Sequence, residues 1–369
     1  MNIQTETLNR EEAVALELCR LYEQSGYRQF RMRHLEEYAL YLENKNFLPS
    51  EYVIPFTGAD GRLMALKPDV TLSILKTTKA TEKDTQKLYY RESVFRFDRR
   101  GGDYKEINQL GLEMLGGVDA FSEAELCMLA AQSLASIKEN YLLCFSHMGL
   151  LGAVISGLGL SEEEGAALLP FLQSRNPHDL FQCAIEKGVE EDKATALISL
   201  IDGTISPRET VLVAKELAGS AAGDMAAKEL LELLDILCAC GYKERVQVDF
   251  SVVVDRLYYN GVAFCGYVEG IPQMILSGGR YDLLAQRFGK EISAMGFAVY
   301  VSELLRFESA QSAFDADVAL LYSEKDCPAA VAKAAQVLRK SGKSVLAVKA
   351  LPSDAKVKET VYFKEGALC

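Results

Sequence analysis

Two long strand-like runs near residue 100 constrain the fold of this chain more than any other feature. "QKLYYRESVFRF" and "EINQLGLEMLGG" are rich in aromatic and aliphatic residues and are joined by the polar loop "DRRGGDY". Two such runs around a polar loop that contains glycine predict an antiparallel pair. The two-residue period of a strand places Gln109, Gly111 and Glu113 on one face of the returning strand. That polar face is either a solvated sheet surface, which is the simpler interpretation, or part of a binding site.

Composition limits what a protein with such a sheet can do. A chain of 369 residues predicts two or three domains with a large core. The apolar share of 49% and the charged share of 25% are ordinary for a soluble globular protein. The net charge of −12 argues against broad, nonspecific binding of nucleic acids, because such binding depends on lysine and arginine.

The usual signs of secretion, membrane insertion and metal binding are missing from the sequence. The start is polar and acidic, and no apolar run approaches the length of a membrane span. We therefore expect a cytoplasmic protein that does not enter a membrane. The nine cysteines form no C-x-x-C pattern and are expected to be reduced thiols, and no two of the three histidines lie four residues apart. We expect no metal and no cofactor.

Capping patterns predict helices on both sides of the strand pair. Asn9 and Glu12 form a capping-box pattern at the start of a first helix, which ends at Gly26. Ser122 is the expected cap of a second helix, over "SEAELCMLAAQSLASI".

Residues 145–240 change to a composition rich in Ala, Leu and Glu with helical periodicity. This predicts a helical insertion within a larger sheet domain, with breaks at Pro170, Pro177 and Pro207. Strand-like sequence returns at "RVQVDFSVVVD", "VAFCGYVEG" and "MILSGG". The tail, from about residue 315, predicts one parallel β-α-β unit.

Further polar clusters occur away from the strand pair. They are Lys67–Thr71 and Tyr258–Asn260. Together with Gln109 and Glu113 they supply carboxylates, hydroxyls and an amide, which suit a small zwitterion. Carboxylates would bind its ammonium, while amide and hydroxyl groups would bind a polar side chain.

These stretches resemble the motifs of class II aminoacyl-tRNA synthetases of the histidyl type. "YYRESVFRFDRRGGDYKEINQLGLEMLG" is similar to motif 2, and "SGGRYDLL" with "AMGFAVYVSELL" is similar to the glycine-rich loop and motif 3. "LKPDVT" resembles the family's Pro-Glu-Gly-Thr element, and "RLYYNGVAFCGYV" resembles the strand after its histidine-recognition motif. The resemblance covers residues 10–308, in the family's order, and includes a similar helical insertion.

The resemblance implies an α+β fold, in which an antiparallel sheet of the class II aminoacyl-tRNA synthetase type is flanked by helices. We expect this core in residues 1–144 and 241–310, with the helical insertion at 145–240 and a short C-terminal β-α-β segment at 311–369. The segment after Phe307 is shorter than the family's anticodon-binding domain, so binding of transfer RNA is not expected.

An amino-acid pocket is also implied by the resemblance. Asp69 replaces a glutamate that would bind the histidine ammonium, and Glu113 is expected to accept a hydrogen bond from the imidazole. Either Arg96, the motif 2 arginine, or Arg256 would bind the carboxylate. The full set expected to bind histidine as an effector is Asp69, Thr71, Arg96, Gln109, Glu113, Arg256, Tyr258 and Tyr259.

The phosphate side of the family's site is not kept. Asp103 and Glu303 stand where the family has phosphate-binding arginines, and Val254 stands where it has a catalytic arginine. Two unit charges 4 Å apart interact by about 4 kcal/mol at an effective dielectric constant of about 20. Replacing attraction by repulsion therefore weakens ATP binding by several decades. We expect no catalytic residues and no adenylate formation.

A class II fold without synthetase chemistry resembles the family of ATP phosphoribosyltransferase regulatory subunits. In that family a histidyl-synthetase paralogue pairs with a short catalytic chain in the first step of histidine biosynthesis, and histidine regulates the pair. The resemblance implies a non-enzymatic chain that pairs with the short-form catalytic subunit and forms a dimer within a hetero-oligomer. That dimer would be built on motif 1, near residues 26–37, where Arg33 replaces the family's proline.

Three other functions stay open at this point. One is a histidyl-tRNA synthetase with displaced arginines, because strand alternation returns Arg256 to the face of Val254. Another is a synthetase-like ligase that acts on an acceptor other than transfer RNA, which would also need ATP. The third is a scaffold that binds no ligand.

Overall fold

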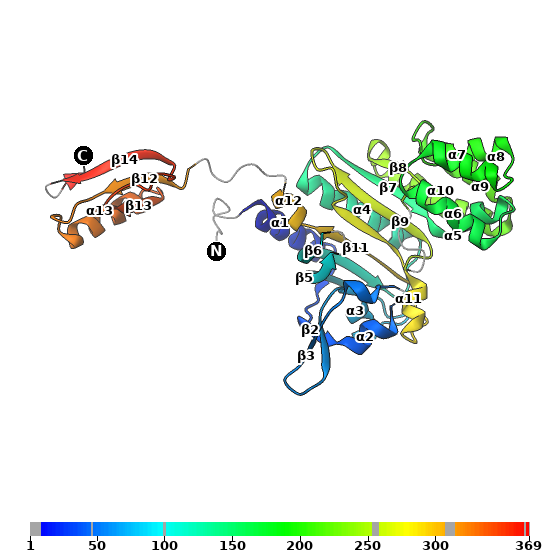
Figure 1. The fold of residues 1–369 in the computed structure, drawn as a ribbon, viewed down its shortest axis with the longest axis horizontal. Helices are drawn as coiled ribbons and strands as arrows, with labels where there is room; N and C mark the ends of the chain where they lie inside the picture. Colours follow the sequence, from blue (N-terminus) through cyan, green and yellow to red (C-terminus); the bar gives the residue numbers. More distant parts are fainter. Residues whose placement is uncertain are drawn as a thin grey trace. The chain divides into compact units, whose positions relative to one another are not determined.

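The strands predicted around residue 100 lie at the centre of an eight-stranded sheet (Figure 1). The computed structural model describes residues 9–45, 47–98, 101–252, 258–306, 314–364 and 367–368. In it β5 (Gln86–Asp98) and β6 (Asp103–Leu115) pair antiparallel along their whole length, as predicted.

Six further strands complete this sheet. They are β1 (Arg28–Gln29), β7 (Tyr141–His147), β8 (Val246–Val248), β9 (Val262–Val268), β10 (Leu276–Arg280) and β11 (Ala294–Tyr300). The order is β1-β5-β6-β11-β10-β9-β7-β8. The pairs at the two ends, β1–β5 and β7–β8, are parallel, and the pairs between them are antiparallel. An antiparallel-dominated sheet therefore carries the first part of the chain, as expected.

Side-chain alternation gives the two faces of the sheet different surroundings. One face packs against α1 (Arg10–Gln24) and α4 (Ala120–Ile137), and the even-numbered residues of β6 from 110 to 114 point into this core. The odd-numbered residues from 109 to 113 point to the other face. Gln109 and Glu113 are only 5% and 2% exposed, so the interpretation of this face as a solvated surface is wrong.

A small sheet and three short helices lie on the polar face of the large sheet (Figure 1). The strands β2 (Leu35–Glu37), β4 (Leu63–Leu66) and β3 (Ile54–Thr57) pair antiparallel in that order. The helices are α2 (Tyr38–Glu43), α3 (Thr71–Thr77) and α11 (Asp282–Arg287), and a 3-10 turn, η2 (Ser50–Tyr52), precedes β3. Their apolar side chains form a second core with residues of β5 such as Tyr90.

The helical insertion packs onto the large sheet beside β7. Its helices are α5 (Met148–Gly157), α6 (Glu162–Gln173), α7 (Pro177–Glu186), α8 (Glu191–Ser199), α9 (Pro207–Ala218) and α10 (Ala221–Ala239). The turn η3 (Lys243–Arg245) leads back to β8, and α12 (Ser302–Arg306) follows β11. Among the described helices none is both long and apolar enough to cross a bilayer, even the 19-residue α10.

Two of the three predicted proline breaks are helix starts. Pro177 and Pro207 each occupy the first turn of a helix, where the missing N–H is not needed. Pro170 instead lies inside α6, so the break expected there is wrong. The flanking Leu168 and Leu172 are fully buried in the core, and this packing holds the last turn of α6 in place despite the missing hydrogen bond.

Helix caps agree with the sequence at α1 and differ at α4. The capping box at Asn9 and Glu12 is present, with the side-chain oxygen of each accepting the backbone N–H of the other. The cap of α4 is Asp119, whose carboxylate accepts the N–H of Ser122 at 2.8 Å. The expectation of Ser122 as the cap is therefore wrong. The cap lies three residues earlier than expected, and the helix begins at Ala120.

The chain divides into two compact units, Met1–Phe307 and Glu308–Cys369. The second unit contains β12 (Ala316–Leu321), α13 (Pro328–Lys340), β13 (Val345–Val348), β14 (Val357–Lys364) and β15 (Ala367–Leu368). β12 and β13 are parallel and joined through α13, which confirms the predicted β-α-β unit. β14 adds to the other side of β12, and β15 pairs with β14. The sequence did not predict these last two strands.

Replacing Asp119 by alanine tests the corrected cap. The change leaves the N–H of Ser122 without its acceptor, and we expect the free energy of unfolding to fall by about 1 kcal/mol. Ser122→Ala, which keeps that acceptor, is the matched control and should cost clearly less. Urea titration followed by circular dichroism measures both. A larger loss in the serine variant would restore the original prediction.

Candidate functional site

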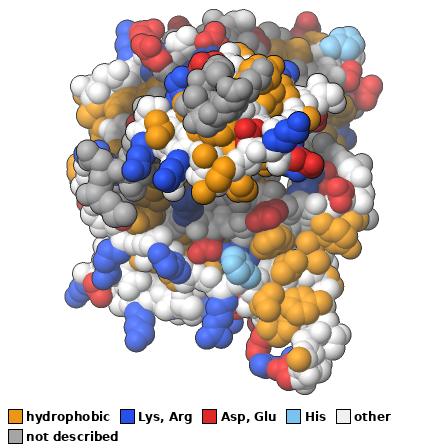
Figure 2. Space-filling model, turned by 90° about the vertical axis from the view of Figure 1, so that its left-hand side faces the viewer, with side chains coloured by type: hydrophobic (Ala, Val, Ile, Leu, Met, Phe, Trp, Pro, Cys, Tyr) orange, Lys and Arg blue, Asp and Glu red, His pale blue; other side chains and the backbone are white. Residues whose placement is uncertain are grey.

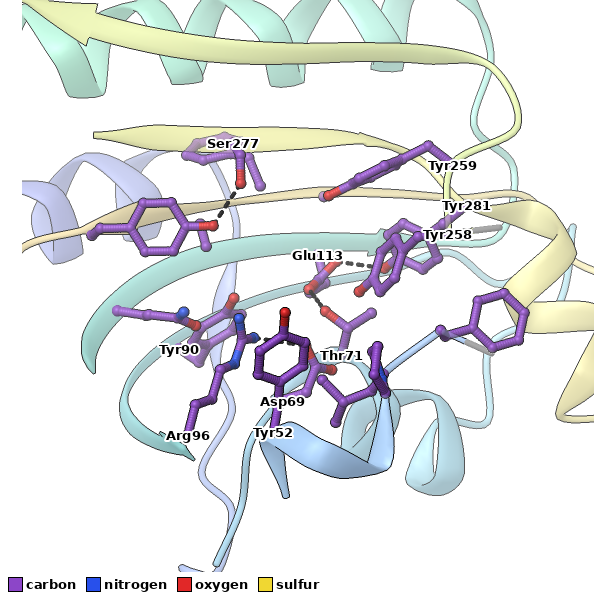
Figure 3. A pocket seen from close by; sticks show the side chains of 18 residues that line it. Tyr52, Asp69, Thr71, Tyr90, Arg96, Glu113, Tyr258, Tyr259, Ser277 and Tyr281 are labelled. Atoms are coloured by element: carbon purple, nitrogen blue, oxygen red, sulfur yellow. Dashed lines mark hydrogen bonds and ion pairs between the residues drawn. The ribbon is translucent and has the colours of Figure 1, made fainter. Parts of the chain in front are cut away.

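A cavity of about 370 Å³ opens on the polar face of the large sheet (Figure 3). Side chains from β5, β6, β10, β11 and the start of α3 line it, together with the segment around Tyr259. The lining residues are Phe47, Leu48, Pro49, Tyr52, Asp69, Thr71, Tyr90, Arg96, Gln109, Glu113, Tyr258, Tyr259, Ser277, Tyr281, Gly296, Phe297, Ala298 and Tyr300.

Glu113 lies at the floor of this cavity with both carboxylate oxygens occupied. The Thr71 hydroxyl donates to Oε1 at 2.6 Å, and the Tyr281 hydroxyl donates to Oε2 at 2.5 Å (Figure 3). A carboxyl that is 2% exposed would be costly to bury without such donors. The two hydroxyls come from α3 and from the residue that precedes α11, so Glu113 joins three elements.

Burial makes Glu113 a weak acid. It raises the pKa of this carboxyl from 4.5 to about 8, against the opposing effect of the Thr71 and Tyr281 hydrogen bonds. The nearby carboxyl of Asp69 adds to the increase. Near neutral pH Glu113 therefore carries a proton in much of the population.

Asp69 and Arg96 form the polar wall across from Glu113. Asp69 Oδ1 accepts the N–H of Leu72, in the first turn of α3, at 3.0 Å, while Oδ2 lies 3.8 Å from the Arg96 guanidinium. Arg96 Nε donates to the carbonyl of Pro68 at 2.8 Å. Burial raises the pKa of Asp69, and the charge of Arg96 opposes that increase. The Leu72 N–H and the Arg96 guanidinium therefore fix the position of the Asp69 carboxylate in the cavity wall, where it could pair with a cationic group of a ligand.

A buried ion pair fixes the segment that carries Asp69. Lys67 is fully buried and pairs with Glu92 of β5. The backbone of Lys67 also accepts the N–H of Phe95 at 2.9 Å and donates to the carbonyl of His34 at 3.0 Å. Because Lys67 cannot move without leaving a buried charge unpaired, the position of Asp69 two residues later is rigid.

Glycines make room for the lining side chains. A Cβ at Gly111 would overlap the ring of Tyr90, and a Cβ at Gly296 would overlap the carboxylate of Glu113. Gly111 lies opposite Ala298 in the β6–β11 pairing, and Gly296 lies opposite Glu113. The cavity therefore depends on a floor of very small residues in the middle of the sheet, where glycine usually marks a close approach.

Aromatic rings close the end of the cavity near Glu113. The rings of Tyr258 and Tyr259 lie 4.7 Å apart, and those of Tyr258 and Tyr281 lie 5.9 Å apart. At the other end Ser277 and Tyr300 share a hydrogen bond of 2.6 Å. The pocket thus has an aromatic, carboxyl-containing end and a second end lined by hydroxyl, amide and guanidinium groups.

The structure brings together most of the residues expected to bind histidine. The members that line this one cavity are Asp69, Thr71, Arg96, Gln109, Glu113, Tyr258 and Tyr259. Arg256 lies outside the described residues, as does Val254. Asp103 begins β6 and Glu303 lies in α12, and neither lines the cavity.

Sequence reasoning missed several lining residues. They are Tyr52, Tyr90, Ser277, Tyr281 and Tyr300. Tyr281 lies within the "SGGRYDLL" stretch, where its place between a glycine pair and a short helix was a usable signal. The position of Tyr300 depends on the pairing of β10 with β11, which a single strand pattern does not contain.

No group of three His, Cys, Asp or Glu side chains in the described part of the chain could hold a metal ion. Among the described lining residues, the carboxyl groups are those of Asp69 and Glu113 and the basic group is that of Arg96. This set suits a small ligand that carries an ammonium, a carboxylate and a further N–H group.

Comparison with known proteins agrees with the fold and the motifs. A family model described as histidyl-tRNA synthetase matches residues 2–304. The chain belongs to this family. The expected class II, histidyl-synthetase-like fold is therefore confirmed.

Curated relatives of this chain include ATP phosphoribosyltransferase regulatory subunits. The chain is 28% identical over 299 residues to the ATP phosphoribosyltransferase regulatory subunit of Bacillus thuringiensis (strain Al Hakam). The alignment covers 80% of this chain and 71% of the relative. The regulatory subunit of Bacillus cereus (strain AH820) matches with the same identity and coverage. The predicted similarity to this family of subunits is confirmed.

Solved structures share the fold. A protein of Bacillus halodurans C, described as an ATP phosphoribosyltransferase regulatory subunit/histidyl-tRNA synthetase, superposes with a TM-score of 0.76 at 21% identity, over 95% of this chain and 93% of the other. The histidyl-tRNA synthetase of Nostoc sp. PCC 7120 gives 0.69 at 16% identity, over 93% and 83%. A chain of an ATP phosphoribosyl transferase (HisG:HisZ) complex from Thermotoga maritima gives 0.61 at 16% identity, over 79% and 97%.

The pKa of Glu113 predicts a pH dependence of stability. The folded state keeps a proton that the unfolded state releases above pH 4.5, so this contribution to the free energy of unfolding is complete below pH 4.5 and is lost as the pH rises through about 8. Glu113→Gln does not titrate. Its stability relative to the natural protein should therefore rise across this range, by up to about 1.4 kcal/mol per pH unit.

Urea titrations from pH 5 to pH 9 measure this difference, and the infrared carbonyl stretch of a protonated carboxyl, absent from the variant, reports the proton directly. A difference that stays constant over the whole range would mean that Glu113 is ionised throughout.

Proposed function

We propose that this chain is the non-catalytic regulatory subunit that pairs with a short-form ATP phosphoribosyltransferase catalytic chain. In this role it is required for the first step of histidine biosynthesis. The observation that carries the proposal is the similarity to chains named as that subunit over 299 residues. The similar chain from Thermotoga maritima belongs to a complex described as HisG:HisZ, which contains two different proteins. This supports a hetero-oligomer.

Histidine is the proposed effector of the cavity. Asp69 would bind the ammonium, Glu113 would accept from an imidazole N–H, and Arg96 would pair with the carboxylate. Gln109 and Tyr259 lie in the same cavity and add polar contacts. Supporting this proposal, the two acids and the arginine line a space of about 370 Å³, which is of a size for a small ligand.

Self-association as a dimer is a further part of the proposal. An exposed apolar surface lies on the β3–β4 hairpin and the neighbouring ends of β5 and β6, where Figure 2 shows hydrophobic side chains gathered low on the molecule. Ile54 and Leu66 lie beside Phe95 and Tyr104, and Tyr104 is 66% exposed. Leu35 of β2, which pairs with Leu66, is 45% exposed. Exposed apolar surface of this kind is typical of protein–protein contacts. Its position next to residues 26–37 supports the predicted motif 1 dimer.

A cytoplasmic location and the lack of a role with transfer RNA complete the proposal. The described cysteines are free thiols, as is usual in a reducing compartment. The net charge of −12 offers little to a polyanion.

The histidyl-tRNA synthetase function is the second candidate. The observation in its favour is Arg96, the motif 2 arginine, which lines the cavity with part of its side chain accessible. Against it stand Asp103 and Glu303, two acids at positions where the resemblance implies phosphate-binding arginines, so that the contacts expected for ATP phosphates are not available there.

Mixing this chain with a short-form ATP phosphoribosyltransferase catalytic chain tests the main proposal. We expect one complex in size-exclusion chromatography with light scattering, and a clear increase in phosphoribosyltransferase activity. Light scattering of this chain alone reports the dimer. Separate elution at micromolar concentrations together with unchanged activity would refute the partnership. The same preparation should give background rates of histidine-dependent pyrophosphate–ATP exchange, and clear exchange would favour the synthetase.

Substitutions in the cavity test the effector site. Asp69→Asn still accepts the N–H of Leu72 but loses the charge for the ammonium, and Glu113→Ala removes the acceptor for the imidazole. Each should weaken histidine binding by about 1.5–3 kcal/mol, because a polar ligand group is left unpaired. Calorimetric titration in the presence of the catalytic chain measures this, with the exposed Glu139→Ala as control. Unchanged affinity in both cavity variants, with intact circular dichroism, would place histidine elsewhere.

A further inference from the structure

The floor of the cavity is a set of cross-strand rows with different side-chain sizes. One row pairs Glu113 of β6 with Gly296 of β11, and the next pairs Gly111 with Ala298. Two residues further along the strands, Gln109 lies directly opposite Tyr300. Same-face positions follow each other at about 7 Å along a strand. The residues of β11 on the floor are therefore small in the first two rows, at Gly296 and Ala298, and large in the third, at Tyr300.

A hydrogen bond extends the bulky third row across the floor. Tyr300 shares a hydrogen bond of 2.6 Å with Ser277 of β10, drawn as the dashed line from Ser277 in Figure 3. Ser277 lies opposite Ala298, one row back toward Glu113. The bond therefore holds the tyrosine hydroxyl over the Ala298 row. We call this pair the Tyr300–Ser277 bar.

The bar closes the end of the cavity that faces away from Glu113. Arg96 lies on β5 beyond the Tyr300 row, because the same-face residues of that strand run from Tyr90, opposite Gly111, toward Arg96. Arg96 and Ser277 both lie on the side of the cavity away from Tyr258 and Tyr259 (Figure 3). A ligand with its N–H side chain on Glu113 and its carboxylate toward Arg96 would therefore have its carboxyl end on the side where the bar lies. This orientation rests on the proposed function of the cavity.

We propose that the Tyr300–Ser277 bar restricts the cavity to free amino acids and excludes derivatives enlarged at the carboxyl group, such as amides, esters and adenylates. The bar leaves no space beyond the carboxylate of the ligand, so a group attached to that carboxylate would collide with Tyr300. A site of this kind responds to the free amino acid and ignores the activated or conjugated forms in the same cell. Tyr300 and Ser277 are thus specificity-determining residues of the site.

The test compares two probes, L-histidine and L-histidine β-naphthylamide, on the full-length chain in the presence of the catalytic chain. Calorimetry gives the ratio of the two affinities for the natural protein and for Tyr300→Ala. We expect this ratio to shift toward the naphthylamide by about tenfold or more in the variant, which corresponds to about 1.4 kcal/mol. Ser277→Ala, which frees the tyrosine ring to turn, should shift the ratio in the same direction by a smaller factor. It keeps the test available if Tyr300→Ala does not fold.

Tyr300→Phe distinguishes the effect of the ring from that of the hydrogen bond, because it keeps the ring and removes the hydroxyl that bonds to Ser277. It should behave like Ser277→Ala and unlike Tyr300→Ala. If the natural protein binds histidine but Tyr300→Ala and Ser277→Ala leave the ratio unchanged, the bar is refuted and the histidine pocket stands. If neither the natural protein nor any variant binds histidine, the histidine pocket is refuted and the bar with it.

Discussion

The burial of one carboxyl group, that of Glu113, sets the arrangement of everything around the cavity. A side chain that is 2% exposed in the middle of an eight-stranded sheet needs hydrogen-bond donors that come from outside the sheet. Thr71 and Tyr281 supply them, and these residues lie 42 and 168 positions away along the chain. The starts of α3 and α11 must therefore converge on one point. The glycine at 296 leaves the carboxylate the space it occupies.

The balance of charge in the cavity follows from the same burial. Burial raises the pKa of both Asp69 and Glu113, the charge of Asp69 raises that of Glu113 further, and Arg96 favours the ionised form of Asp69. A ligand ammonium placed on Asp69 would supply a second positive charge, since Arg96 is the one basic group among the described lining residues. A zwitterion completes this set of charges, whereas a polyphosphate would add negative charge beside two carboxyls. The electrostatics of the cavity thus agree with an amino-acid ligand more than with a nucleotide.

Sequence patterns predicted the parts of this structure that depend on local order. The alternation at 109–113 placed its polar residues on one face, and the capping box at Asn9 is present. Burial of that face was not predictable, since it depends on the small sheet and on α3, which cover it from other parts of the chain. The bond between Ser277 and Tyr300 likewise requires the register of β10 against β11. The break expected at Pro170 fails because tertiary packing outweighs a local preference.

The helical insertion and the large sheet share a single hydrophobic cluster, so the insertion cannot be exchanged without changing the core of the sheet. The cluster continues from Leu112 of β6 through Leu134 of α4 and Phe145 of β7 to Leu234 of α10. If residues 148–239 were removed and the ends joined, apolar side chains of α4 and β7 that the insertion now covers would be exposed to solvent. The insertion therefore cannot be transplanted by itself from one relative to another. A chimaera would have to carry the matching faces of α4 and β7 along with it.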